Sequence, residues 1–144
     1  MSVSGAFEVR MSGGAGEYSE TLLDHYRHPR NVGDVEGSAA VAQVGDPAHG
    51  DVLRFGMKIE GDQVIEARFR SFGCTAAIAA GSMATVMVTG KRLEEVERVS
   101  NRDVAEALGG LPESKQHCSV LAEQAIREAL RRWREAGAGE TPCR

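Results

Sequence analysis

Two hydrophobic periods divide the chain into a strand-rich first part and a helix-rich second part. Apolar side chains occupy every second position from Leu53 to Ile59 and again from Ile65 to Phe69. A period of two is typical of strands with one buried face, and the polar turn at 60–63 joins these strands into an antiparallel hairpin. Residues 39–44 predict one more strand before the hairpin, so the sequence predicts three strands in all.

Helices account for the remaining pattern. Ser19 is the predicted N-cap of a short helix that ends at Pro29. Small and apolar residues from Thr75 to Thr89 predict a helix that Gly90 closes. Further helices are predicted over Leu93–Val99, Asp103–Leu108 and Cys118–Ala136. Strands that come first with helices after them indicate an α+β fold, a small three-stranded antiparallel sheet with helices packed on one face.

Length and composition fit one globular domain. The chain has 144 residues, and we expect the domain to span 18–137 between flexible tails at 1–17 and 138–144. The formal net charge of −4 argues against a nucleic-acid partner. Apolar runs stay below the roughly eighteen residues of a membrane span, and we expect no membrane association and no secretory leader. The three cysteines lie far apart, which favours a reduced, cytoplasmic protein over a disulfide framework.

Five side chains at three places carry candidate metal or thiol chemistry. Cys74 lies where the last strand gives way to a helix, and Cys118 lies at the predicted start of the last helix. A helix N-terminus lowers the pKa of a cysteine, and the thiolate is the form that binds metal. His117 precedes Cys118, and His49 and Asp51 flank one glycine between the first two strands. Together they form a mixed nitrogen, oxygen and sulfur set suited to zinc or iron.

Each of these features also has a purely structural interpretation. No two cysteines have CxxC spacing, and a cysteine in a reduced protein is more often a small buried hydrophobic side chain than a ligand. Cys143, in the predicted tail, is interpreted as an incidental thiol. Arg127, Arg131, Arg132 and Arg134 make the last helix basic, which indicates a solvated face or, alternatively, a docking surface for an acidic partner.

Several short motifs follow one another in a fixed order. They are Tyr18-Ser19-Glu20, Asp24-His25-Tyr26, Pro29-Arg30-Asn31-Val32-Gly33, Gly50-Asp51-Val52, Phe72-Gly73-Cys74, Leu111-Pro112-Glu113-Ser114-Lys115 and His117-Cys118-Ser119. With these motifs the chain resembles the IscU/NifU-type iron–sulfur cluster scaffold proteins from about Tyr18 to Ala136. The resemblance implies the same α+β fold and a function in cluster assembly rather than in enzymatic catalysis.

The resemblance also implies a site at one exposed edge, where three cysteines and an aspartate hold a transient [2Fe–2S] cluster or a zinc ion. By motif, Cys74 corresponds to the second cysteine, Cys118 to the third, which accepts sulfur as a persulfide, and Asp51 to the aspartate that keeps the cluster labile. His117 corresponds to an optional ligand. A cysteine desulfurase supplies the sulfur. Other implied partners are an Hsp70-type chaperone, ferredoxin-like or frataxin-like donors of electrons and iron, and apo iron–sulfur recipient proteins.

The chain departs from the family pattern in two motifs. His49 stands where the family has its first ligand cysteine. Imidazole ligates iron in Rieske centres, and its exchange for thiolate makes a cluster less negative and raises its reduction potential. In the chaperone-recognition stretch, the family's Leu-Pro-Pro-Val-Lys is Leu-Pro-Glu-Ser-Lys at residues 111–115. Histidine at position 49 gives either an altered cluster site or a site better suited to zinc.

Three functional hypotheses follow. The first is a cluster scaffold or carrier that accepts sulfur from a desulfurase, as a monomer or weak dimer. The second, from another class, is a zinc-binding sulfur acceptor or regulatory paralogue that builds no cluster. The third is a zinc hydrolase in which Asp51 is the base, for which the sequence predicts no substrate pocket. The sequence favours the first hypothesis.

Overall fold

A computed structural model of the chain describes residues 18–136. The tails predicted at 1–17 and 138–144 lie outside the described residues. The elements, in chain order, are α2 (Glu20–Arg27), β1 (Val41–Asp46), the 3-10 turn η2 (Pro47–His49), β2 (Asp51–Glu60), β3 (Gln63–Phe72), α3 (Thr75–Val88), α4 (Leu93–Val96), α5 (Asn101–Ala107), η3 (Glu113–Lys115) and α6 (Gln116–Glu135).

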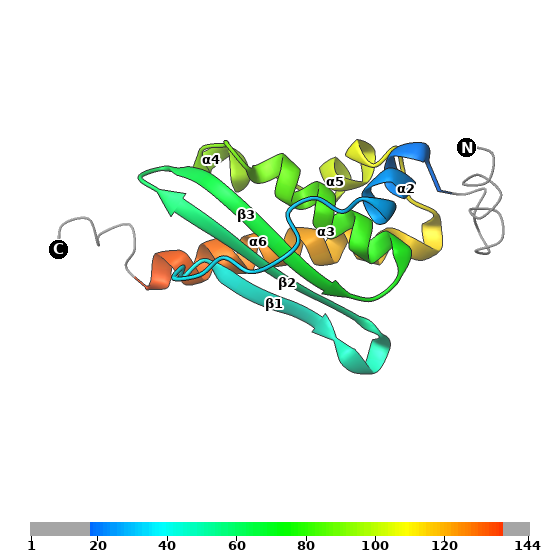
Figure 1. The fold of residues 1–144 in the computed structure, drawn as a ribbon, viewed down its shortest axis with the longest axis horizontal. Helices are drawn as coiled ribbons and strands as arrows, with labels where there is room; N and C mark the ends of the chain where they lie inside the picture. The colour runs from blue at the N-terminus through cyan, green and yellow to red at the C-terminus, as the bar shows by residue number, and fades with distance from the viewer. Residues whose placement is uncertain (1–17, 137–144) are drawn as a thin grey trace.

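The sheet has the order β1-β2-β3 with both neighbouring pairs antiparallel, as the sequence predicted. Helices α3 and α6 pack along the sheet on the same side (Figure 1), and their small and aliphatic residues close the core over Phe55 and Phe69. The predicted fold class, a three-stranded antiparallel sheet with helices on one face, is therefore confirmed. The register places the β1–β2 turn and the end of β3 at the same end of the sheet, because Asp46 pairs with Asp51 and Val52 with Phe72.

Element boundaries differ from the prediction where local caps decide them. The first strand begins at Val41 instead of residue 39, because Ser38 binds Met57 O and Ala40 N and holds a turn there. Helix α5 starts at Asn101 instead of Asp103, since Ser100 and Asp103 form a capping box. The last helix starts at Gln116 rather than Cys118. Cys118 therefore lies inside the first turn of α6, not at its first residue.

Helix α3 lies close against β3 because it presents almost no side-chain volume to the sheet. A Cβ atom built on Gly81 would lie 2.6 Å from Cδ2 of Phe69 and 3.1 Å from Cδ1 of Leu53. Glycine at this position allows the helix backbone to approach the sheet, and the N-terminus of α3 is thereby fixed against the strand ends.

A buried polar cluster anchors α2 and the segment after it to α3. His25 Nδ1 lies 2.7 Å from Ser82 Oγ, and the same hydroxyl oxygen accepts a hydrogen bond from Arg30 N. Asn31 Nδ2 donates to Thr85 Oγ1 at 3.0 Å. His25 is buried, and this burial lowers the pKa of its imidazole; the charge of Arg30 adds to the effect. The first helix and its His-Pro segment thus support α3 rather than the site.

Acidification is expected to destabilise the fold through His25. Since its pKa is lowered in the folded state, the unfolded chain binds the proton more tightly, and stability falls as the pH falls below about 6.5. Urea unfolding at pH 7.5 and pH 5 measures the loss. His25→Gln should remove part of the pH dependence, whereas His28→Gln, at a side chain that is 75% exposed, should leave it unchanged. An identical pH dependence in wild type and His25→Gln would contradict this assignment.

No helix between residues 18 and 136 has the length and apolar character needed to cross a bilayer.

Candidate thiol and metal site

The two cysteines predicted to act together are in contact. Cys74, the N-cap of α3, and Cys118, in the first turn of α6, place their Sγ atoms 3.7 Å apart. Two sulfur ligands about 2.3 Å from one zinc or iron atom in tetrahedral geometry are about 3.8 Å apart. The observed separation therefore suits a shared metal atom without a large movement of either helix. Cys118 is 1% exposed, and Cys74 is half-buried.

Asp51 and His117 complete a continuous set of donor atoms beside the thiols. Asp51 begins β2, and its Oδ1 accepts a hydrogen bond from Cys74 N at 3.3 Å. Its Oδ2 lies 2.8 Å from His117 Nε2, and the same ring nitrogen lies 3.6 Å from Cys118 Sγ. The structure thus brings together Asp51, Cys74, His117 and Cys118 at the end of the sheet where β2, α3 and α6 meet.

His49 is the fifth predicted residue, and its backbone lies in the turn that leads to Asp51. It closes the 3-10 turn η2, for which the Asp46 side chain accepts a hydrogen bond from Ala48 N. Gly50 follows in the left-handed region with φ of 85°, a conformation that glycine adopts without strain. One residue therefore separates His49 from Asp51 at the rim of the site. A ligand role for its imidazole stays a prediction.

The two thiols differ in ionisation, and here one expectation is wrong. The sequence predicted a lowered pKa for both cysteines. The pKa of Cys74 is indeed lowered, to about 5, by hydrogen bonding with Cys118 and with the backbone of Ala77 and by the charge of Lys115. The pKa of Cys118 is raised instead, because its sulfur donates to the Cys74 thiolate and is buried. The pair therefore holds one shared proton and presents one thiolate.

The side chains do not stand around an empty metal position. Among residues 18–136, no three His, Cys, Asp or Glu side chains have the arrangement of a metal site. Asp51 and His117 are bound to each other at 2.8 Å, and the same His117 Nε2 lies 3.6 Å from Cys118 Sγ. A metal held by all four donors would replace the Asp51–His117 hydrogen bond by bonds to the metal. The donor set itself, two thiols with a carboxylate and an imidazole, fits zinc or iron.

Two contributors to the site were missed in the sequence. Lys115 caps α6, and its pKa is raised mainly by the charge of Cys74, which places a cation beside the thiolate. Gly73 lies between the strand end and Cys74, and a Cβ atom there would lie 2.4 Å from Asp51 Oδ1. Lys115 stands two residues before His117, so its place near the site could have been predicted from the sequence. The close approach of Gly73 to Asp51 depends on tertiary structure and could not have been predicted in this way.

Gly73→Ala is expected to weaken zinc binding about tenfold, since the added methyl group displaces the Asp51 carboxylate from Cys74 N. Competition with a chromophoric chelator measures the zinc affinity, and circular dichroism checks that the fold is retained. If the effect passes through the carboxylate, Gly73→Ala added to Asp51→Ala should cause little further loss. If the losses of zinc affinity in Gly73→Ala and Asp51→Ala add up fully in the double variant, Gly73 does not act through the Asp51 carboxylate.

The fold and the site together define a class of protein: a small α+β protein in which two thiols, a carboxylate and an imidazole meet at one end of the sheet. Comparison with known sequences names the family. The chain belongs to the NifU-like N terminal domain family, which it matches over residues 17–138. The predicted resemblance is thereby confirmed.

Characterised relatives carry consistent names. The chain is 46% identical over 113 residues to the iron–sulfur cluster assembly scaffold protein IscU 1 of Archaeoglobus fulgidus, covering 78% of this chain and 74% of that protein. It is 45% identical over 117 residues to IscU of Escherichia coli, covering 78% and 91%. The nitrogen fixation protein NifU of Trichormus azollae is 40% identical over 126 residues, but the match spans only 42% of that longer protein.

Solved structures share the fold. A NifU-like N-terminal protein from Brucella abortus has a TM-score of 0.67 at 18% identity, covering 83% of this chain and 95% of that one. A hypothetical protein solved at 2.3 Å resolution has a TM-score of 0.61 at 28% identity, covering 78% and 95%. These likenesses confirm the architecture.

Proposed function

We propose that this protein is an iron–sulfur cluster assembly scaffold: it acts by holding and passing on a cluster, not as an enzyme. The single observation that carries the proposal is the contact between Cys74 and Cys118 beside Asp51 and His117, at 3.7 Å between the sulfurs. The names of relatives such as IscU of Escherichia coli, 45% identical, support the same function. A cytoplasmic location stays a prediction.

The cluster is the cargo of this site. We assign Cys74 and Cys118 as the two thiolate ligands of a [2Fe–2S] cluster and His49 as the ligand that replaces the family's first cysteine. Asp51 completes the set and keeps the cluster labile, because a carboxylate is a harder and weaker ligand for iron in a sulfide cluster than a thiolate. His117 is the exchangeable ligand, and zinc is the alternative occupant of the same donors.

Sulfur delivery is proposed to occur as persulfide transfer from a cysteine desulfurase. The acceptor is assigned to Cys118, which first passes the shared proton to the Cys74 thiolate. The resulting Cys118 thiolate attacks the outer sulfur of the donor persulfide; one S–S bond forms, one breaks, and the donor cysteine leaves as thiolate. Because Cys118 is 1% exposed, the first turn of α6 must move before the transfer. Reduction of the bound sulfane sulfur to sulfide takes two electrons, which the ferredoxin-like partner supplies.

The remaining partners follow from the same reaction. Ferrous iron comes from a frataxin-like or other iron donor, and the finished cluster passes to apo iron–sulfur proteins. Release by an Hsp70-type chaperone rests on residues 111–115, in which Leu111 is partly covered by the core and Glu113 and Ser114 are exposed. The two exposed central residues differ from the family's Pro-Val, so a chaperone that recognises this chain must accept Glu113 and Ser114 there.

Transfer of a cluster to an acceptor tests the proposal. Protein loaded anaerobically with iron and sulfide is mixed with an apo ferredoxin of the [2Fe–2S] type, and circular dichroism in the visible range follows cluster arrival. The scaffold function predicts transfer faster than formation from free iron and sulfide. A protein that retains only zinc, and from which no cluster reaches the ferredoxin, would support the zinc-binding regulator instead.

A further inference from the structure

The two edges of the sheet are treated differently by the rest of the chain. At β3, Phe69 donates to Asn31 O and accepts from Gly33 N, and Val64 is bonded in the same way to 90–91. Val64 and Phe69 on that edge are therefore paired with segments outside the sheet. At β1, Met57 N donates to Ala40 O, so by antiparallel alternation Ala42 and Val44 face β2.

Gln43 consequently directs its backbone N–H and C=O away from the sheet. Within residues 18–136 no backbone group is bonded to Gln43 from that side. An exposed edge of this kind is a template for one more strand. The strand is short and carries no proline or lysine, the residues that commonly block such pairing.

A groove runs along this edge between β1 and α6. One part, of about 430 Å³, is lined by Gln43, Val44 and Gln124 together with Arg127, Glu128, Arg131 and Arg132. The second part, of about 320 Å³, is lined by Gly45, Asp46, Asp51, His117, Val120, Leu121 and Gln124. Gln124 lies in both parts, so the groove leads from the arginines of α6 to the Asp51–His117 end of the thiol site.

The charge along the groove is uneven. The far part carries three arginines against one carboxylate, although the whole chain has a net charge of −4. Glu128 is shared by Arg131 and Arg132, Arg131 also pairs with Glu135, and Arg127 pairs with Glu123. The arginine side chains are about half exposed, so a partner carboxylate competes with these ion pairs at little cost. The middle of the groove is aliphatic, with Val120 37% exposed.

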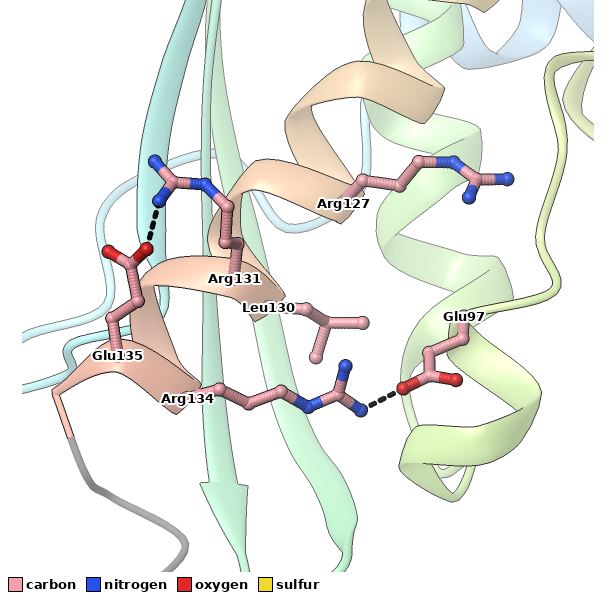
Figure 2. A pocket seen from close by; sticks show the side chains of 6 residues that line it. All are labelled: Glu97, Arg127, Leu130, Arg131, Arg134 and Glu135. Atoms are coloured by element: carbon pink, nitrogen blue, oxygen red, sulfur yellow. Dashed lines mark hydrogen bonds and ion pairs between the residues drawn. The ribbon is translucent and has the colours of Figure 1, made fainter.

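Arg134 lines a neighbouring cavity, which shares Arg127 and Arg131 with the groove. Figure 2 shows Arg134 extending toward Glu97 while Arg131 extends toward Glu135, and the cavity of about 530 Å³ there is lined by both ion pairs. Arg134 does not line the β1 groove. It therefore offers a matched arginine on the same helix that an occupant of the groove does not touch.

We propose that the groove binds an extended, acidic segment of a partner protein, which adds as a fourth strand to β1 at Gln43 and places its carboxylates on Arg131 and Arg132. Its aliphatic residues cover Val44 and Val120, and its other end reaches the rim of the thiol site. The basic stretch of the last helix thus acts as a docking surface, not only as a solvated face. That the bound partner exchanges sulfur or cluster with the site rests on the proposed function; the binding itself does not.

A synthetic peptide tests the binding directly. The probe is a fluorescein-labelled peptide of alternating valine and threonine followed by four glutamates, and its control carries four lysines instead. Fluorescence anisotropy should show at least tenfold tighter binding of the acidic peptide, weakened by salt. Amide chemical shifts should change along β1 and the facing part of α6.

Two pairs of variants separate the contributions. The double variant Arg131→Gln/Arg132→Gln should bind the acidic peptide about tenfold more weakly than the wild type, whereas Arg134→Gln should leave this affinity unchanged. Gln43→Pro removes the outward N–H at a position where an edge strand tolerates proline, and it should weaken binding of both peptides. Gln43→Ala retains the N–H and should bind normally. Thermal unfolding confirms that each variant is folded.

Equal affinity for the acidic and the lysine peptide would overturn the proposal. So would a loss of affinity in Arg134→Gln as large as that in the double variant, or amide chemical-shift changes on the outer face of the sheet instead of along β1. Sedimentation showing a dimer that Gln43→Pro abolishes would assign the edge to a second copy of the chain. The peptide assay contains no metal and no sulfur donor, and Cys74→Ser should bind the peptide normally. Failure of the scaffold function and failure of the groove are thus distinguishable.

Discussion

Cys118→Ser is expected to lose both persulfide acceptance and cluster assembly. The serine hydroxyl group is neither a sulfur nucleophile nor a metal ligand of comparable strength. The substitution also removes the thiol that lies 3.7 Å from the Cys74 sulfur. After incubation with a cysteine desulfurase and cysteine, mass spectrometry should find the added 32 Da (about the mass of one sulfur atom) on Cys118 of the wild type and no such adduct at that position in the variant. Visible absorption of the reconstituted variant should fall at least tenfold.

Cys143→Ser is the matched control for removal of a thiol. Its residue lies outside the described part of the chain, and the sequence assigns it no role, so persulfide formation and absorption should both be retained. Persulfide found only on Cys74, the more accessible thiol, would contradict the assignment of Cys118 as acceptor. A normal cluster in Cys118→Ser would contradict its assignment as ligand.

His49→Cys is expected to lower the reduction potential of the bound cluster by roughly 100 to 350 mV, about half the difference between Rieske and plant-type ferredoxin centres, which differ by two exchanged ligands. A third thiolate adds negative charge and restores the family's ligand pattern. Anaerobic electrochemistry of the loaded proteins measures the shift, and cluster yield should rise in the same variant. His49→Ala should lose most of the cluster.

His28→Cys serves as the control for a histidine-to-cysteine change away from the site. His28 follows the first helix, and its side chain is 75% exposed beside Asp24. Neither potential nor yield should change in this variant. An unchanged potential in His49→Cys would remove His49 from the ligand set and leave Cys74, Cys118 and Asp51 to hold the cluster with His117.

Much of the fold was predictable because local patterns agree with tertiary packing. The alternation places Leu53, Phe55, Met57, Ala67 and Phe69 on one buried face as predicted. At Ile65 the prediction is wrong: Ile65 is 41% exposed and Val64 is buried instead, where the β2–β3 register shifts between Lys58 and Ile59. Gly90, in the left-handed region with φ of 86°, closes α3 as predicted. Helix starts were less predictable, since η3 before α6 is set by backbone turns after Pro112 that no periodicity reveals.

The donor residues of the site were also predictable, but their physical states were not. Motif order placed Asp51, Cys74, His117 and Cys118 together, and the structure does so. The raised pKa of Cys118 depends on burial and on the neighbouring thiolate, which only the packing of α6 against α3 creates. The open edge of β1 likewise depends on which strand ends the sheet.

The most direct test of the scaffold function is the metal and sulfide content after anaerobic reconstitution with ferrous iron, cysteine, a cysteine desulfurase and dithiothreitol, which reduces the persulfide sulfur to sulfide, in the presence of equimolar zinc. A scaffold is expected to hold iron and sulfide in equal amounts, with charge-transfer absorption that Cys74→Ser abolishes. Protein that emerges with zinc and no sulfide would contradict it, and would make this chain a zinc-bound member of the family that builds no cluster.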